Sequence, residues 1–197
     1  MDVSPAVAAT LGFAAGLAIE TALQKVSVEA SLRSTGSEDM KFSLKWPNDV
    51  LAGRQKLVGI GLEVEAVADN RLAVVVGIGT NVVVAPEGMP TPATSLAALG
   101  VNIGAEELFA VLSDCWVEFH GTWDQGRGFG EIRRLWLERA AGLGRPVAIH
   151  TGGTIVEGTF DTVDEQGCMI VRTPDGKRVP ISAGDVYFGS AASAGAA

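Results

Sequence analysis

Hydrophobic side chains alternate with small or polar ones in three segments between positions 41 and 81. A period of two is the pattern of a β-strand with one buried face. The predicted strands cover residues 41–46, 56–65 and 71–81, and their short connections favour an antiparallel meander. The face predicted to be buried carries Phe42, Leu44, Trp46, Val58, Ile60, Leu62, Val64, Leu72, Val74, Val76 and Ile78.

The opposite face of these predicted strands has few side chains. It carries a lysine, an asparagine and two glycine pairs: Lys45, Asn81, Gly59, Gly61, Gly77 and Gly79. Glycine inside a strand weakens it and often marks a place where a ligand or another backbone comes close. Bulges or a tight helix–sheet contact are the alternative explanation. Two glycine pairs beside a lysine and an asparagine favour the floor of a ligand site.

Helical spacing of apolar residues predicts helices on both sides of this β region. Ser4 is a suitable N-cap and Pro5 a suitable first helical residue, so a helix is predicted to begin there and to end near Lys25. A polar loop is expected over residues 33–39. Further helices are predicted at about 94–100, 105–123 and 132–141. The buried stripe predicted for the longest of these is Leu108, Leu112, Trp116 (or Cys115), Phe119 and Trp123.

The last third of the chain has a different pattern, in which short β runs alternate with turn sequences such as Gly152-Gly153 and Pro174-Asp-Gly176. The predicted runs are 147–150, 155–163, 168–172, 178–181 and 186–188. This arrangement suits a small SH3-like barrel. We therefore predict a first domain over residues 1–143, an SH3-like domain over 144–189 and a disordered tail over 190–197. The overall class is α+β: a mixed or antiparallel sheet with helices on one face, plus the barrel.

Composition narrows the function classes. The chain has 197 residues, a formal charge of −8 and a pI near 4.7, which argues against nonspecific binding to nucleic acid. Two isolated cysteines, Cys115 and Cys168, fit a reducing cytoplasm, and His120 and His150 are too separated for a metal site. The apolar stretch 5–23 is rich in alanine and glycine and contains an acidic residue, so a buried helix is preferred to a membrane span.

Four motifs now make a resemblance specific. They are Lys45-Trp-Pro-Asn-Asp49, Lys56-Leu-Val-Gly-Ile60, Gly77-Ile-Gly-Thr-Asn81 and Ala93-Thr-Ser-Leu96. In content, order and spacing the chain resembles the biotin protein ligases, from Ser4 to Ser190. The resemblance implies a class II synthetase-like catalytic core and a C-terminal SH3-like domain. It also implies an enzyme that makes biotinyl-5′-AMP from biotin and ATP with Mg²⁺, then transfers biotin to a lysine of a biotin carboxyl carrier domain of acetyl-CoA carboxylase or another carboxylase.

The resemblance also implies roles for particular residues. Lys45 matches the family's active-site lysine, which contacts both biotin and ATP. Gly59, Gly77 and Gly79 match positions that line the biotin pocket. Asn81 matches the residue near the ATP phosphates and Mg²⁺. Asn48 and Asp49 are interpreted as turn residues that shape a hairpin rather than react.

Some family features differ in this chain. The Gly-Arg-Gly-Arg loop that orders over biotin and the adenylate has no counterpart in these residues, so we expect residues 1–197 alone to form the adenylate weakly or not at all. Gly61 stands where a larger apolar residue is usual, and Gly189 where some members carry an arginine. A non-catalytic biotin- or adenylate-binding remnant and a lipoate-ligase relative are the alternatives. A cytoplasmic protein without DNA or membrane partners is expected, and a homodimer is compatible with the resemblance.

Overall fold

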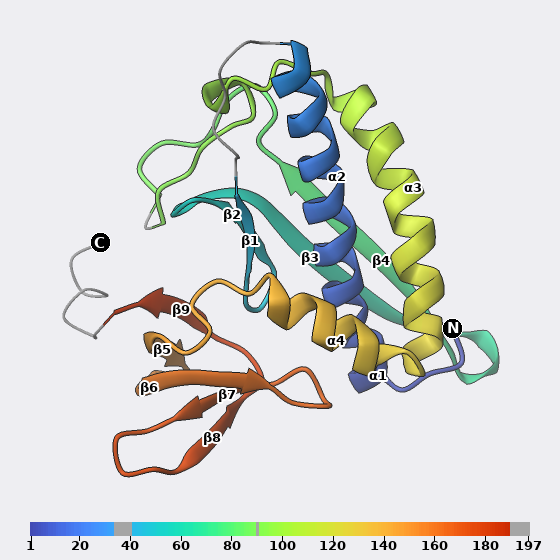
Figure 1. The fold of residues 1–197 in the computed structure, drawn as a ribbon. Coiled ribbons are helices and arrows are strands. Elements are labelled where there is room, and N and C mark those ends of the chain that lie inside the picture. Colours follow the sequence, from blue (N-terminus) through green and yellow to red (C-terminus); the bar gives the residue numbers. More distant parts are fainter. Residues whose placement is uncertain (34–40, 90, 190–197) are drawn as a thin grey trace.

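The computed structural model describes residues 1–33, 41–89 and 91–189. Its N-terminal helix is divided into two segments (Figure 1). They are α1 (Pro5–Ala9) and α2 (Leu11–Arg33). Ser4 caps α1 as predicted, since its Oγ accepts a hydrogen bond from Val7 N at 3.3 Å. The predicted end near Lys25 is wrong, because the helix continues to Arg33. The predicted polar loop beyond residue 33 and the predicted tail 190–197 lie outside the described residues.

The first sheet has four antiparallel strands in the order β1-β2-β3-β4. They are β1 (Phe42–Lys45), β2 (Asp49–Ala52), β3 (Gln55–Val67) and β4 (Arg71–Thr80). The three predicted strands are confirmed, but β2 was missed and its first residue was assigned to a turn. Three of the four residues of β2 are buried, so the strand shows no alternation that a sequence pattern could detect.

The alternation along β3 correctly assigns Val58 and Ile60 to the buried face, but Val64, predicted to be buried with them, is 43% exposed because it lies toward the outer end of the strand. Ile60 is 5% exposed, whereas Gly61 beside it is exposed. α2 covers the buried face (Figure 1) and comes close because it carries small residues. A Cβ at Gly16 of α2 would lie 3.4 Å from Leu44 and 3.8 Å from Ile60. α2 therefore packs on the face of Leu44 and Ile60, opposite to the face that carries Gly59 and Gly79.

α3 and α4 complete the helical layer. Their bounds, with those of the short 3-10 helices, are η1 (Ala68–Asn70), η2 (Ala97–Leu99), α3 (Ala105–Trp123), η3 (Asp124–Gly126) and α4 (Phe129–Glu138). The buried stripe of α3 uses Cys115, which is fully buried, rather than the half-buried Trp116. Trp123 at the end of that stripe donates from Nε1 to Thr10 Oγ1 at 2.8 Å. This hydrogen bond fixes α3 to the break between α1 and α2.

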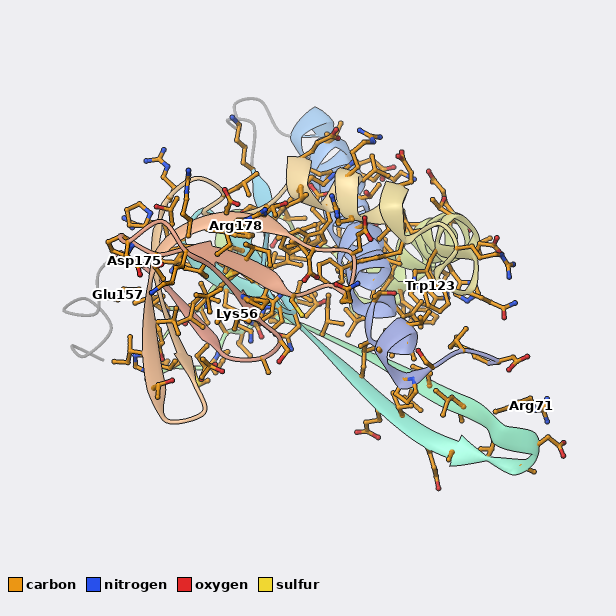
Figure 2. All side chains as sticks on the ribbon, turned by 90° about the horizontal axis from the view of Figure 1, so that it is seen from below. Lys56, Arg71, Trp123, Glu157, Asp175 and Arg178 are labelled. Atoms are coloured by element: carbon orange, nitrogen blue, oxygen red, sulfur yellow. The ribbon has the colours of Figure 1, made fainter. Side chains whose placement is uncertain are left out.

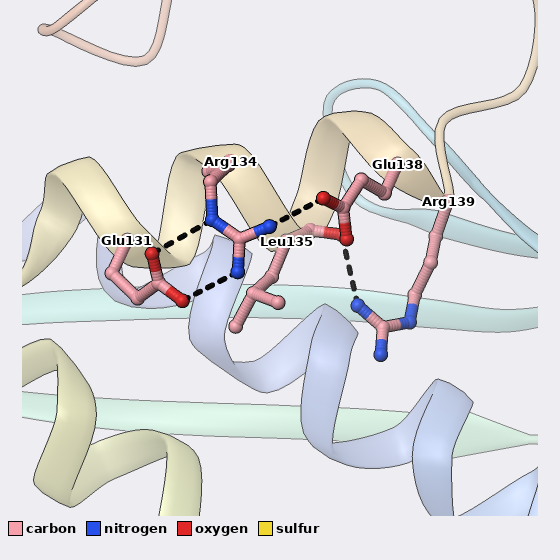
Figure 3. Close-up of polar contacts among 5 residues, drawn as sticks. All are labelled: Glu131, Arg134, Leu135, Glu138 and Arg139. Carbon is pink, nitrogen blue, oxygen red and sulfur yellow. Dashed lines mark hydrogen bonds and ion pairs between the residues drawn. The ribbon is translucent and has the colours of Figure 1, made fainter.

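α4 carries a row of charges on its outer side and one buried ion pair at its end. Figure 3 shows Arg134 between Glu131 and Glu138, and Arg139 donating from Nη1 to Leu135 O at 2.9 Å. Arg139 also places Nε 3.1 Å from Glu20 Oε2. Glu20 is 4% exposed and lies within α2. The end of α4 is therefore tied electrostatically to the central helix.

The second sheet has five antiparallel strands in the order β8-β7-β6-β5-β9. They are β5 (Pro146–Thr151), β6 (Thr154–Val163), β7 (Met169–Arg172), β8 (Arg178–Ile181) and β9 (Asp185–Phe188). All five β runs predicted from the sequence occur within about one residue of these bounds. The boundaries 1–143 and 144–189 between the proposed domains stay a prediction.

Among the described residues, the segment Pro5–Ala30 is the one stretch long and apolar enough to cross a membrane. In the fold, 72% of its most apolar window is buried. Its apolar surface is therefore covered by the first sheet and by α3 and α4, as expected of a core helix (Figure 1).

Candidate functional site

A single row of paired residues crosses the first sheet on its open face. The register pairs Lys45 with Asp49, Asp49 with Gly59, and Gly59 with Gly79. Directly paired residues in an antiparallel sheet point to the same face. The row therefore runs from two charged side chains on β1 and β2 to two positions without side chains on β3 and β4.

This row forms one wall of a cavity of about 480 Å³. The loop after β4 and strand β9 of the second sheet form the other walls. The lining residues are Lys45, Asp49, Lys56, Leu57, Val58, Gly59, Gly79, Thr80, Asn81, Pro86, Met89, Thr91, Ala93, Asp185, Val186 and Tyr187. A cavity of this size suits a small organic ligand rather than a single ion.

Lys45 lines the cavity and is largely buried, only 9% exposed. Burial lowers the pKa of Lys45 below the usual value for lysine, and the positive charge of Lys56 acts in the same direction. The carboxylates of Asp49 and Asp185 oppose this shift. A desolvated cation of this kind interacts strongly with an anionic ligand, because little water is left to screen it.

Asp49 stands between two lysines. Its Oδ1 lies 2.5 Å from Lys56 Nζ, and its Oδ2 lies 3.9 Å from Lys45 Nζ. The interpretation of Asp49 as a simple turn residue is therefore wrong. Asn48 does shape the local backbone, since it lies in the turn before β2 and donates from Nδ2 to Ile60 O at 2.7 Å.

Asn81 connects the sheet to the loop that closes one side of the cavity. Its side-chain Nδ2 donates to Thr94 O at 3.0 Å, and its main-chain carbonyl oxygen accepts from Leu96 N at 2.9 Å. Because the amide nitrogen is used inside the protein, the side-chain oxygen is the group left to interact with a ligand. The segment that contains Thr94 and Leu96 is thereby attached to the end of β4.

The structure brings together most of the residues predicted from the sequence. Lys45, Gly59, Gly79 and Asn81 line one cavity. Gly77 lies on the same face but outside the lining residues, where it pairs with Gly61. The residues predicted from the sequence therefore include Lys45, Gly59 and Gly79 of the row that lines the cavity. They also include Gly77, which belongs to the next residue pair and does not line this cavity.

Sequence reasoning missed three charged residues of the cavity: Asp49, Lys56 and Asp185. Alternation alone places Lys56 on the buried face with Val58. That conflict, a lysine among core positions, was the available signal that the strand is irregular. Asp185 lies far away in the sequence and is brought in by the packing of the second sheet, so no local pattern indicates it.

Comparison with known proteins identifies the protein family to which the chain belongs. Residues 2–81 match the family described as "Biotin/lipoate A/B protein ligase family", and residues 142–189 match "Biotin protein ligase C terminal domain". The chain is 35% identical over 188 residues to a biotin–[acetyl-CoA-carboxylase] ligase of Paracoccus denitrificans, which covers 92% of this chain and 74% of that protein. The chain belongs to the biotin–[acetyl-CoA-carboxylase] ligase family.

Other relatives agree. A ligase of the same description from Mycobacterium tuberculosis is 37% identical over 145 residues, covering 73% of this chain and 52% of the relative. The chain thus spans about half the length of that relative. The solved structure of the biotin protein ligase from Aquifex aeolicus in complex with biotin and ATP has a TM-score of 0.72, with 23% identity, 91% of this chain and 72% of that chain covered. At this identity the likeness concerns the fold.

Proposed function

We propose that this chain joins biotin to ATP as biotinyl-5′-adenylate and transfers biotin to a lysine of a carrier domain. In the first step a carboxylate oxygen of biotin attacks the α-phosphorus of ATP, and the bond to the departing pyrophosphate breaks. In the second step the ε-amine of the acceptor lysine attacks the acyl carbon, loses a proton, and AMP departs. The buried ammonium of Lys45 beside a glycine floor is the observation that carries the proposal.

Lys45 has the properties that the first step demands. A carboxylate and a phosphate, both negative, must approach each other, and a fixed cation between them lowers that barrier. Lys45 is 9% exposed, so its charge is held in place and poorly screened by solvent. Its ion pair with Asp49 is long, 3.9 Å, which leaves the ammonium able to bind a ligand oxygen.

The glycine floor supports recognition of a flat, fused ring. A side chain at Gly79 would project into the cavity, where the nearest atom is Gly59 O at 3.8 Å. We assign Gly59 and Gly79 to the biotin side of the site, whereas the role predicted for Gly77, which lies outside this cavity, stays a prediction. The Aquifex aeolicus ligase that shares this fold was solved with biotin and ATP bound, which is consistent with both ligands.

Asn81 and the loop beside it are assigned to the nucleotide side. The described residues contain no group of three or more His, Cys, Asp or Glu side chains suited to a metal ion. Mg²⁺ usually takes few protein ligands and several phosphate oxygens, so this donor set fits a Mg²⁺ ion carried by ATP. The side-chain oxygen of Asn81 would hold it, with the carboxylates of Asp49 and Asp185 on the same cavity. The ion would supply neutralisation of the phosphate charge.

The acceptor follows from the name of the relative. The Paracoccus denitrificans protein is described as acting on acetyl-CoA carboxylase, so we propose the biotin carboxyl carrier domain of that enzyme as the acceptor. A cytoplasmic location, the absence of DNA and membrane partners, and a homodimer stay predictions.

Two other functions fit less well. A lipoate ligase would share the catalytic fold, but the curated relatives reported above are biotin ligases and the second sheet matches a biotin ligase domain. A non-catalytic binding remnant is disfavoured because the relatives reported above are ligases. Both alternatives are therefore disfavoured.

The test is biotin-dependent exchange of labelled pyrophosphate into ATP by the protein, followed by transfer to a carrier domain. Lys45→Ala is expected to lower the exchange rate by about 100-fold or more while the melting temperature is retained. Lys177→Ala, which removes an exposed lysine of the second sheet, is the control. Wild-type protein that exchanges no pyrophosphate, or a Lys45→Ala variant with full activity, would refute the proposal.

A further inference from the structure

Lys56 reaches the open face of the first sheet because β3 contains a bulge. Two successive residues of β2 pair with Val58 and with Lys56, so Leu57 has no partner. A bulge adds one residue to a strand and reverses the alternation of side chains beyond it. Lys56, which simple alternation puts on the buried face with Val58, therefore lies on the face of Gly59.

The side chain of Lys56 fills the space that a side chain at position 59 would need. A Cβ at Gly59 would lie 3.3 Å from Lys56 Nζ and 3.4 Å from its Cε. Gly79, on the neighbouring strand, has no such neighbour. The glycine at 59 therefore accommodates the end of a lysine side chain as well as lining the cavity.

Asp49 holds the ammonium of Lys56 at 2.5 Å, through an oxygen that is buried and accepts no well-aligned hydrogen bond. The contact is therefore ionic rather than directional. Lys56 keeps 38% of its side chain exposed and Asp49 only 13%. The lysine is thus the more accessible of the two side chains to a ligand in the cavity.

The charges of the cavity balance only if Lys56 is counted. The charged residues among its lining residues are Lys45, Lys56, Asp49 and Asp185. Without Lys56, two carboxylates would outnumber one ammonium, and the cavity would repel a polyphosphate. With Lys56 the cavity is neutral before the ligands bind.

We propose that Lys56 is the second phosphate-binding lysine of this site and contacts the pyrophosphate that leaves ATP. This rests on the adenylate-forming function proposed above. The attacking carboxylate and the departing oxygen lie on opposite sides of the α-phosphorus, so one ammonium cannot serve both. Lys45 and Lys56 lie beside different oxygens of Asp49. Lys45 therefore faces the carboxylate, and Lys56 binds the negative charge that grows on pyrophosphate as its bond to the α-phosphorus breaks.

The experiment compares Lys56→Met, which keeps the length of the side chain and removes its charge, with Lys56→Arg, which keeps the charge. We expect Lys56→Met to raise the KM for ATP and for pyrophosphate by about tenfold or more in the exchange reaction, and Lys56→Arg to recover most of the loss. The affinity for biotin, measured by calorimetry, and transfer from synthetic biotinyl-5′-adenylate to the carrier domain should not change. A residue that only supports the fold would affect all four quantities.

Lys177→Met is the matched control. Lys177 pairs with Asp175 at 2.6 Å on the second sheet, a contact like that of Lys56 with Asp49. Figure 2 labels Asp175 at the margin of the molecule, away from Lys56. Unchanged KM values for ATP and pyrophosphate in Lys56→Met, beside an inactive Lys45→Ala, would overturn this inference alone. Losses in biotin affinity equal to the losses in ATP affinity would also overturn it. Full activity of both variants would overturn the proposed function as well.

Discussion

Trp46 donates a hydrogen bond from its indole Nε1 to the carbonyl oxygen of Gly167, at 3.0 Å. Trp46 follows Lys45 directly and is 2% exposed, whereas Gly167 lies in the turn between β6 and β7 of the second sheet. Because the partner of Trp46 belongs to the second sheet, that sheet helps to fix the backbone beside Lys45. The second sheet also supplies Asp185 to the cavity.

Gly167→Ala is expected to destabilise the protein and to weaken adenylate formation. Gly167 has a φ of +83°, and a Cβ there would lie 3.0 Å from Cε2 of Phe13. The alanine therefore adds backbone strain and a tight contact in the turn that holds Trp46, at a cost of about 1–3 kcal/mol. Thermal denaturation and the exchange rate measure the two effects.

Gly176→Ala is the matched control for that change. Gly176 has nearly the same φ, +82°, but a Cβ there would meet nothing within 4 Å. It should therefore show the strain of a positive φ alone. Equal losses of stability in the two variants would mean that the contact with Phe13 has no effect.

A valine at position 79 should block biotin without unfolding the sheet. Gly79 does not have a positive φ, and its Cβ would meet only Gly59 O at 3.8 Å, so the backbone tolerates a side chain. The side chain would project into the cavity and should raise the Kd for biotin by about tenfold or more, measured by calorimetry. Gly61→Val, on the same face but outside this cavity, should retain affinity; equal losses would move the biotin site toward Gly61.

The pH dependence of pyrophosphate exchange should have an alkaline limb below pH 10.5. Burial lowers the pKa of Lys45 from that ordinary value, so Lys45 loses its proton before a free lysine does. Between the lowered pKa of Lys45 in the folded protein and pH 10.5, the unfolded state binds more protons than the native state. Deprotonation of Lys45 therefore makes the stability rise with pH in this range while the activity falls. Lys45→Arg, if active, should lose the limb because arginine stays protonated. A limb at or above pH 10.5 in the wild type would contradict this.

The sequence predicted the features that depend on local periodicity. Alternation assigned Ile60 to the core and Gly79 to the open face, and both assignments hold. The position of Lys56 on the open face was not predicted from the sequence. It depends on a bulge at Leu57, and that bulge arises from pairing with β2, which is too short and too buried to show a pattern. The contribution of β9 could not be predicted either, since tertiary packing rather than spacing brings it to the cavity.

The buried ion pair between Glu20 and Arg139 offers a test of how the helical layer is held. Burial raises the pKa of Glu20 above its usual value of 4.5, and Arg139, 3.1 Å away, partly offsets this. A raised carboxyl pKa means that the native state binds the proton more tightly. The contribution of Glu20 to stability is therefore largest below pH 4.5 and is lost as the pH rises through the pKa of the folded state.

Arg139→Met should therefore destabilise the protein mainly at neutral pH. It leaves the Glu20 carboxylate buried without a cation, at a cost of about 2–3 kcal/mol after allowance for the partial exposure of Arg139. The loss should shrink near pH 4.5, where Glu20 takes up a proton, and Glu20→Gln in the same protein should restore most of the stability. Arg134→Met, which removes the exposed pairs with Glu131 and Glu138 (Figure 3), should cost much less stability than Arg139→Met, because solvent screens exposed ion pairs. Urea denaturation at pH 4.5 and pH 7 compares the wild type, Arg139→Met, the double variant Arg139→Met/Glu20→Gln, and Arg134→Met. If the stability lost in Arg139→Met does not vary with pH, then packing of the arginine, not its charge, holds α4 to α2.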